Sequence, residues 1–328
     1  MTPGEEAVAV IVAGDALVDL TPARTTLGTL AYEPHPGGSC LNVAVGVARL
    51  DVPTAFLGRL SHDPFGVLLR DHLTASGVLD GWSLATDDLS TLAFVHLAAG
   101  GEATYSFHAE GAADRGLRPE HLHQLPNGGR LPPRAALHLG SIALVFEPVA
   151  STLEGLLQRE ARSRLISLDP NIRPALIADR DAYLRRFATW TADADIVKVS
   201  SEDLAWLYPD IPEDRVVADW LAEGVALVLV THGADGARAS TACSSARVPA
   251  PETRVVDTVG AGDAFTAGTL AFLHETGALD RVAVRALDAA SLERLLAFAC
   301  GVAASTCTRR GADPPRRRQL SRGGPVTR

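Results

Sequence analysis

Short apolar runs alternate with amphipathic segments along most of the chain. Residues 40–50 repeat apolar side chains at the spacing of one helix face, which predicts an amphipathic helix. Residues 65–75 and 148–161 are predicted as further helices, the first of them preceded by Asp63 as a cap and by a proline. Apolar runs of strand length occupy residues 8–12, 54–57, 136–139, 165–168, 196–199 and 226–230. This alternation predicts an α/β fold, with a doubly wound and mostly parallel sheet that carries helices on both faces.

Two pairs of segments depart from this pattern. Residues 92–97 and 103–107 flank a glycine-containing turn, which is typical of an antiparallel hairpin. Together with residues 20–35 they predict a small β-sheet that stands off the main body, and we interpret it as a lid that excludes water during transfer chemistry. Residues 238–239 and 247–248 are expected to pair across the small residues between them.

These elements predict one domain over residues 1–313. Its lid segments are expected at about 20–36 and 90–110. Residues 314–328 are rich in proline, glycine and arginine, which predicts a flexible tail.

Composition narrows the function classes. The chain has 328 residues, 47% of them hydrophobic, and a formal net charge of -9, which supplies no basic surface for a nucleic-acid partner. The first apolar run is too short to span a membrane and no secretion signal precedes it. Four cysteines without a C-x-x-C pair predict neither a disulfide framework nor a zinc site. We therefore expect a cytoplasmic protein with small-molecule partners.

The single lysine tests two nucleotide-binding motifs. Lys198 lies between two valines, so the chain has no Gly-Lys-Ser/Thr phosphate loop. Gly260 and Gly262 are followed by Phe265 where a dinucleotide-binding fingerprint requires its third glycine. A P-loop NTPase and an ordinary Rossmann dehydrogenase are thereby excluded.

A small-residue turn that opens a helix carries the strongest chemical signal. Gly260 and Gly262 remove side chains, so that backbone N–H groups can converge on an anion at the positive helix end. Asp263 would repel a phosphate there, unless it accepts a hydrogen bond from a hydroxyl that attacks phosphorus. Its helix position predicts a depressed pKa. The alternative, that Asp263 only caps the helix, has equal weight from this stretch alone.

A second glycine-opened helix start predicts a sugar site. Gly37 and Gly38 allow close approach to the backbone, and Asn42 follows in the first turn with an amide that both donates and accepts. Asp15 and Asp19, just after the first strand, offer acceptors for further hydroxyl groups.

The two glycine motifs, in this order and separation, resemble the signatures of the ribokinase-like (PfkB) family of carbohydrate kinases over about residues 8–313. Residues 257–263 depart from the family pattern only at Val259, where threonine is common. The resemblance implies transfer of the γ-phosphoryl group of ATP, with Mg²⁺, to a sugar hydroxyl. It implies that Asp263 is the general base, that Gly260, Ala261 and Gly262 form the anion hole, and that sugar contacts include Asp19, Gly38 and Asn42.

The resemblance also implies residues on the nucleotide and cation sides. Ser200 and Asp203 occupy the place of the family's Asn-x-x-Glu, which leaves the organisation of Mg²⁺ open. Lys198 either contacts phosphate or extends its charge to the surface from a strand edge. Nucleotide contacts are further expected at Thr231, Gly233 and Gly236, and a potassium site at Asp257, Val259 and Gly311.

Within the family, residues 101–107, 138–141 and 169–174 are similar to the bacterial fructokinase branch, and Ser39 and Cys40 replace part of the Gly-Gly-Lys-Gly of ribokinases. Fructose is the expected substrate; 2-keto-3-deoxygluconate, ribose, a nucleoside, or a catalytically silent sugar-binding protein are the alternatives. Arg173 either clamps a substrate oxygen or ties down its own loop. A homodimer is expected to form through the lid, with residues 92–97 pairing with their counterpart.

Overall fold

The computed structural model describes residues 8–97 and 103–320. Its larger sheet has the order β13-β12-β11-β10-β9-β8-β1-β4-β5, parallel from β11 to β5 and antiparallel at β12 and β13. The predicted doubly wound, mostly parallel α/β sheet is therefore confirmed. Its strands are β1 (Val10–Ala13), β4 (Thr54–Ser61), β5 (Ser83–Thr86), β8 (Ala136–Gly140), β9 (Ile166–Asp169), β10 (Ile196–Ser200), β11 (Leu227–Thr231), β12 (Ala237–Ser240) and β13 (Ser245–Val248).

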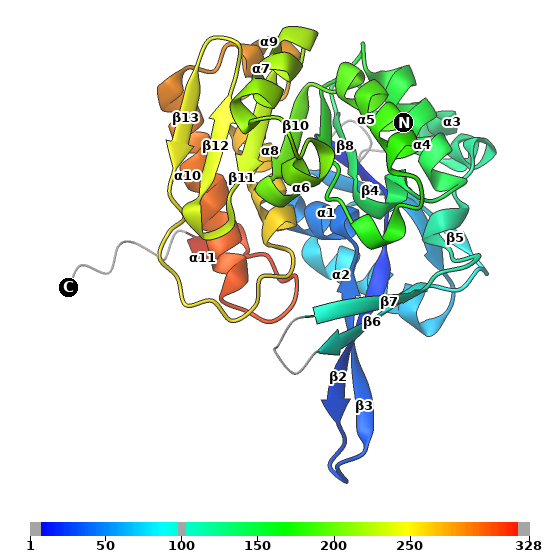
Figure 1. Cartoon of the computed structure of the whole chain (residues 1–328). Coiled ribbons are helices and arrows are strands. Elements are labelled where there is room, and N and C mark those ends of the chain that lie inside the picture. The colour runs from blue at the N-terminus through cyan, green and yellow to red at the C-terminus, as the bar shows by residue number, and fades with distance from the viewer. Residues whose placement is uncertain (1–7, 98–102, 321–328) are drawn as a thin grey trace.

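Helices cover both faces of this sheet (Figure 1). One face packs against α4 (Val149–Glu160), α5 (Arg180–Asp193), α6 (Ser201–Leu207) and α7 (Glu213–Glu223). The other face packs against α1 (Ser39–Arg49), α2 (Pro64–Ser76), α8 (Ala261–Glu275), α9 (Arg281–Arg285) and α10 (Ala289–Cys307). The short helices α3 (Pro126–Gly129) and α11 (Arg317–Leu320) complete the described elements.

The central strands are apolar on both sides because helices bury both faces. Every side chain of β1 is buried, and Val10 pairs in parallel with Thr54 on one side and Ala136 on the other. Polar residues appear where these strands end, as at Asp15 after β1 and Asp169 at the end of β9. The carboxyl edge of the sheet therefore gathers the polar chemistry.

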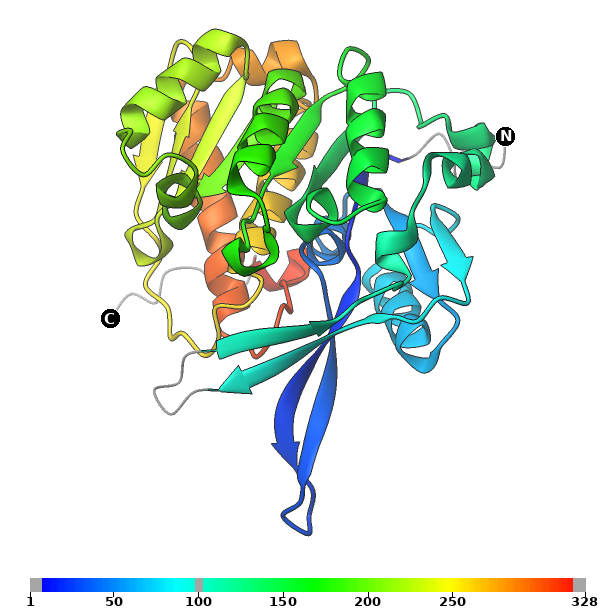
Figure 2. The same cartoon turned by 45° about the vertical axis from the view of Figure 1, so that its right-hand side comes forward.

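A second sheet of four strands forms the predicted lid. It has the order β3-β2-β6-β7 and consists of β2 (Leu17–Arg24), β3 (Leu30–Gly37), β6 (Thr91–Leu97) and β7 (Ala103–His108). Figures 1 and 2 show β2 and β3 as an arm that projects from the main body. The hairpin of β6 and β7 is antiparallel as predicted, although its turn at 98–102 lies outside the described residues.

The strand β6, which we expected at an open edge of the lid sheet, lies inside that sheet. β6 lies between β2 and β7, because it pairs in parallel with β2 and antiparallel with β7. Residues 92–94 use both of their edges inside the sheet, which contradicts their pairing with a second copy; β2 does not pair with residues 95–97, and the homodimer stays a prediction. β3 and β7 are the strands with open edges.

Part of the predicted tail belongs to the folded body. Pro314 and Pro315 are buried, and Arg49 donates hydrogen bonds to the Asp313 carboxylate and the Pro314 carbonyl. The flexible-tail prediction is therefore wrong for residues 314–320, because local composition does not reveal the packing partners on α1. Residues 321–328 lie outside the described range.

Among the described helices, α10 alone is long and apolar enough to cross a bilayer. Leu292, Leu295, Leu296 and Ala299 on α10 are fully buried against the sheet and α8. This packing is that of a core helix.

Candidate active site

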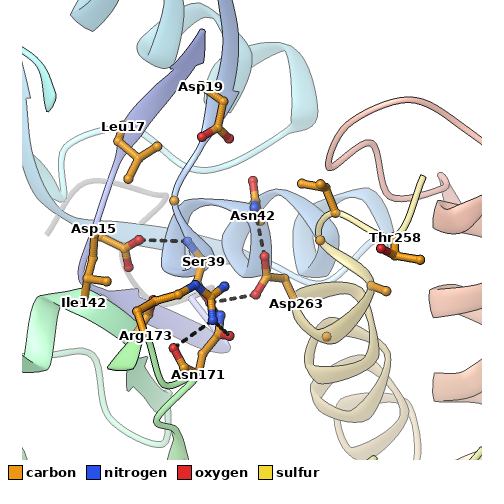
Figure 3. A pocket seen from close by; sticks show the side chains of 16 residues that line it. Asp15, Leu17, Asp19, Ser39, Asn42, Ile142, Asn171, Arg173, Thr258 and Asp263 are labelled. Atoms are coloured by element: carbon orange, nitrogen blue, oxygen red, sulfur yellow. Dashed lines mark hydrogen bonds between the residues drawn. The ribbon is translucent and has the colours of Figure 1, made fainter. Parts of the chain in front are cut away.

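A cavity of ≈ 330 Å³ lies where the end of β1 meets the beginnings of α1 and α8. It brings together most of the predicted catalytic and sugar-binding residues from distant parts of the chain. The lining residues are Asp15, Leu17, Asp19, Gly38, Ser39, Asn42, Ser141, Ile142, Asn171, Arg173, Thr258, Val259, Gly260, Ala261, Gly262 and Asp263 (Figure 3).

The turn before α8 has the form of an anion site. Gly260 adopts the left-handed conformation (φ 73) at the helix N-cap, and no side chain caps this end. A Cβ at Gly260 would lie 2.6 Å from the Cβ of Ala312, so only glycine fits this turn. The Ala261 N–H is bonded to the Thr258 carbonyl, whereas the next first-turn N–H groups have no intrahelical acceptor. They are therefore available to an anion in the cavity.

Asp263 lies in the first turn of α8 and faces α1. Its Oδ1 accepts a 2.6 Å hydrogen bond from Ser39 Oγ, and its Oδ2 accepts a 2.8 Å bond from Asn42 Nδ2. Gly260, not Asp263, occupies the N-cap. The helix-cap interpretation of Asp263 is therefore wrong, and its carboxylate is a buried group held at the cavity wall.

The pKa of Asp263 is raised above its ordinary value, which contradicts the expected depression. Burial is the largest cause, and it outweighs the opposing effect of the hydrogen bonds from Ser39 and Asn42. The prediction considered the helix end but not the cover that α1 places over the carboxylate. A raised pKa makes this group a stronger proton acceptor once it is ionised.

Asn42 lines the cavity and has a buried oxygen without a hydrogen-bond partner. Its Nδ2 donates to Asp263, whereas its buried Oδ1 has no hydrogen-bond partner. Figure 3 shows this oxygen on the side of the amide away from Asp263. Buried polar atoms are normally paired, so this acceptor is suited to a hydroxyl group of a ligand.

Asp15 and Asp19 lie on the same wall but do different things. The Asp15 carboxylate accepts hydrogen bonds from the N–H groups of Ser39 and Cys40, which lie in the first turn of α1. The Asp19 carboxylate makes no hydrogen bond with the described residues, although its backbone is paired in the lid sheet. Burial, followed by neighbouring carboxylates, raises the pKa of each to about 6. Asp19 is thus the freer acceptor of the two.

The glycine pair before α1 leaves room for these carboxylates. A Cβ at Gly37 would lie 2.4 Å from Asp19 Oδ2, and one at Gly38 would lie 2.8 Å from the Asp15 carbonyl oxygen. Gly38 also has φ 102 and lines the cavity, whereas Gly37 lies behind it. Both glycines therefore set the position of the acidic wall.

Arg173 lines the cavity and ties down its own loop. Its Nη1 donates to the Asn171 carbonyl, to Asn171 Oδ1 and to the Ile172 carbonyl. Asn171 in turn donates through Nδ2 to Ser39 Oγ at 2.9 Å. Of the two interpretations of Arg173, the structure shows the loop contacts, and a substrate contact stays a prediction.

Sequence reasoning missed several residues of this wall. Ser39 and Asn171 link the β9 loop to Asp263, and both stand inside stretches that were recognised for other reasons. Leu17, Ser141, Ile142 and Thr258 also line the cavity, and no local pattern marks them.

Lys198 forms a buried ion pair beneath the anion turn. Its Nζ lies 2.9 Å from Asp169 Oδ2, and the two side chains are 5% and 1% exposed. Burial lowers the pKa of Lys198, but the Asp169 and Asp203 carboxylates outweigh it and raise the pKa overall. The interpretation that Lys198 extends its charge to the surface is therefore wrong. It does not line the cavity, and its phosphate contact stays a prediction.

Ser200 and Asp203 are engaged in local structure. They form a capping box at the beginning of α6, and Asp203 Oδ1 also accepts the Ile172 N–H at 2.8 Å. Within residues 8–97 and 103–320, no three His, Cys, Asp or Glu side chains gather as metal ligands. The residues present do not form a protein cage for Mg²⁺, which fits an ion carried mainly by phosphate oxygens.

The remaining predicted nucleotide contacts lie at the carboxyl end of β11 and in the turn that follows it. Thr231 ends β11, and Gly233 and Gly236, both with positive φ, flank the turn into β12. Asp257 accepts hydrogen bonds from the N–H groups of Val259 and Gly311, at 3.0 and 2.8 Å. The structure thus brings the three predicted potassium-site residues together, although it does not test the ion.

The fold and the site define a class of protein that moves a phosphoryl group onto a hydroxyl. Residues 9–318 match the pfkB family carbohydrate kinases. The chain belongs to this family, so the predicted family, ribokinase-like fold and carbohydrate kinase activity are confirmed.

Individual relatives agree with this assignment. The chain is 40% identical over 314 residues to a fructokinase of Rhizobium leguminosarum bv. trifolii, covering 96% of this chain and 93% of that protein. It matches the structure of fructokinase with bound ATP from Xylella fastidiosa at a TM-score of 0.83 and 28% identity, covering 95% and 98% of the two chains. A double mutant of fructokinase from Vibrio cholerae O395, with fructose, ADP and potassium ion bound, matches at a TM-score of 0.82 and 27% identity, covering 97% and 98%.

Proposed function

We propose that this chain is a fructokinase that transfers the γ-phosphoryl group of ATP to the terminal primary hydroxyl of fructose. The observation that carries the proposal is the buried, unsatisfied oxygen of Asn42, a residue that lines the same cavity as Asp263 and the anion turn. A hydroxyl acceptor, a base and an anion site thus share one small cavity. The fructokinase relatives support fructose as the substrate.

The residues divide the work as follows. Asp19 and Asn42 bind sugar hydroxyls, with Asp15, Gly37 and Gly38 holding that wall in place. Ser39 and Asn42 orient the Asp263 carboxylate, which accepts the proton of the attacking hydroxyl.

The N–H groups around Gly260, Ala261 and Gly262 stabilise the negative charge of the group in transfer. ATP would supply the phosphoryl group, and Mg²⁺ would screen the charge of the phosphates. We assign the nucleotide side to the ends of β10 and β11, where Thr231, Gly233 and Gly236 lie. Beside the nucleotide, Ser200 and Asp203 form the capping box that begins α6, and Lys198 pairs with Asp169 at the neighbouring strand end. These contacts hold the nucleotide side in place.

Two further assignments belong to the proposal. A potassium ion beside the anion turn, at Asp257, Val259 and Gly311, would polarise the turn. A homodimer would cover the arm of the lid, where Leu27, Leu30 and Tyr32 are 89%, 64% and 38% exposed.

The four free cysteines fit a reducing cytoplasm.

The decisive experiment is a coupled assay of ADP formation on a panel of sugars at fixed MgATP. Fructose is expected to give the highest kcat/KM among fructose, ribose, 2-keto-3-deoxygluconate and a nucleoside. A higher value for one of the others would refute the substrate while leaving the family intact. Repeating the fructose assay with potassium replaced by tetramethylammonium tests the cation, and sedimentation tests the dimer.

A further inference from the structure

A second cavity lies at the amino-terminal edge of the larger sheet. Its volume is ≈ 790 Å³, and it is bounded by the approach to β1, the start of β9 and the segment between α8 and α9. In Figure 1, α9 lies at the end of the molecule opposite the lid arm of β2 and β3. This cavity is therefore separate from the active site at the carboxyl edge.

Four arginines line this cavity, and we name it the arginine cavity: Arg134, Arg162, Arg164 and Arg281. His274 adds a further polar group, and Asp280 is the acidic residue of the lining. Asp280 Oδ1 accepts the N–H groups of Val282 and Ala283, so that carboxylate is directed at α9. The lining therefore holds more arginines than acidic residues, in a chain whose net charge is -9.

Two of the four arginines are fixed by buried acids. Arg164, whose side chain is 6% exposed, binds Glu160 Oε2 at 2.6 Å and donates to the carbonyls of Pro132 and Ala135. Arg281 binds the fully buried Asp195 carboxylate and donates to the Ala161 carbonyl. Both guanidinium groups are therefore engaged by protein acceptors, and Glu160 and Asp195 balance their charges.

The other two arginines have no partner among the residues that the structure describes. Arg134 and Arg162 are exposed at the cavity and make neither a hydrogen bond nor an ion pair there. Arg134 also has φ 66, a left-handed conformation that an arginine adopts at a cost in energy. Their donors are free for an anion, and guanidinium groups bind phosphate oxygens through paired hydrogen bonds.

We propose that the arginine cavity binds a phosphorylated metabolite, with Arg134 and Arg162 contacting its phosphate group. The cavity is larger than inorganic phosphate requires, and Val8, Ala9, Leu165 and Leu279 give it an apolar wall for the organic part of the ligand. The site is independent of the proposed substrate, because it shares no residue with the active-site cavity.

Calorimetric titration with ribose 5-phosphate and, separately, inorganic phosphate tests the site on the full chain. The double variant Arg134→Ser/Arg162→Ser removes both free guanidinium groups. Its control, Arg185→Ser/Arg215→Ser, makes the same charge change at exposed residues of α5 and α7 that do not line the cavity. Thermal melting checks that each variant is folded, and the single variant Arg162→Ser replaces the double variant if that fails to fold.

We expect wild-type protein and control to bind ribose 5-phosphate more tightly than inorganic phosphate, and the double variant to lose at least tenfold in affinity. Absence of binding to wild type, or equal affinity in all three proteins, would overturn the proposal. An equal loss in the control would show a general charge effect and would also overturn it. Equal affinity for the two probes would overturn the assignment to a metabolite with an organic part.

Discussion

The buried ion pair of Lys198 and Asp169 offers the sharpest test of how the site is supported. Replacing Lys198 by Met keeps a long unbranched side chain but removes the charge. Asp169 then keeps its contacts with the Thr266 hydroxyl, at 3.2 Å, and with the Asn171 N–H, at 3.1 Å. It loses the cation that compensates a 1% exposed carboxylate. An uncompensated buried charge is therefore the perturbation.

Removing one partner of such a buried pair costs about 3–5 kcal/mol. For 328 residues, an entropy of unfolding of about 2.1 cal/mol/K per residue gives roughly 0.7 kcal/mol/K. The Lys198→Met variant is accordingly expected to melt about 4–7 °C below wild type. Arg215→Met is the matched control, since Arg215 and Asp219 lie 2.9 Å apart but are 71% and 48% exposed. It should lose no more than about 0.5 kcal/mol.

One further measurement distinguishes the unpaired charge from simple misfit of the new side chain. The double variant Lys198→Met/Asp169→Asn should recover a large part of the lost stability. Calorimetric and urea unfolding provide both values. A loss of less than about 1 kcal/mol in Lys198→Met, or no recovery of stability in the double variant, would refute the reasoning.

Three other predictions follow from the cavity. Asp263→Asn should retain nucleotide affinity but lose roughly 100- to 10,000-fold in kcat, and turnover near wild type would contradict its role as base. Asp19→Ala should lower kcat/KM for fructose by about 5- to 150-fold, corresponding to roughly 1–3 kcal/mol, with little change in the KM for ATP. An equal rise in the KM for ATP would contradict the assignment of Asp19 to the sugar side. The folded-state pKa of Asp19, about 6, exceeds its ordinary value of 3.8, so the folded state binds more protons in this interval. The unfolding free energy of wild type relative to Asp19→Asn should therefore rise as the pH falls from 7.5 to 4.5, and a flat difference would contradict the raised pKa.

The sequence predicted the elements well because their signals are local. Helix periodicity in residues 40–50 and the glycine turn before α8 each lie within a dozen residues, and the structure confirms both elements. The two glycine-opened helices also predicted which residues would meet at the cavity. Proximity of Asn42 and Asp263, 221 positions apart, then followed from the family resemblance rather than from either stretch.

The wrong predictions concern the burial of a side chain and the identity of its partners. The pKa of Asp263 depends on burial by α1, and the partner of Lys198 lies on a neighbouring strand, 29 positions away. Arg173 is engaged by its own loop, which depends on how that loop turns after β9. Burial and partner choice arise from non-local packing, so single-sequence patterns do not encode them directly.

The position of Lys198 gives the folded chain an unusual reactivity. It is the only lysine, and its ammonium group is enclosed beneath the anion turn. Acylating reagents that modify most proteins at many surface amines should therefore find no lysine on this one while it stays folded. The rate at which Lys198 is acylated would measure how often the carboxyl edge of the sheet opens, because the reagent reaches the ammonium group only after that region separates. Mass spectrometry of a single site would then report how firmly substrates hold the catalytic centre closed.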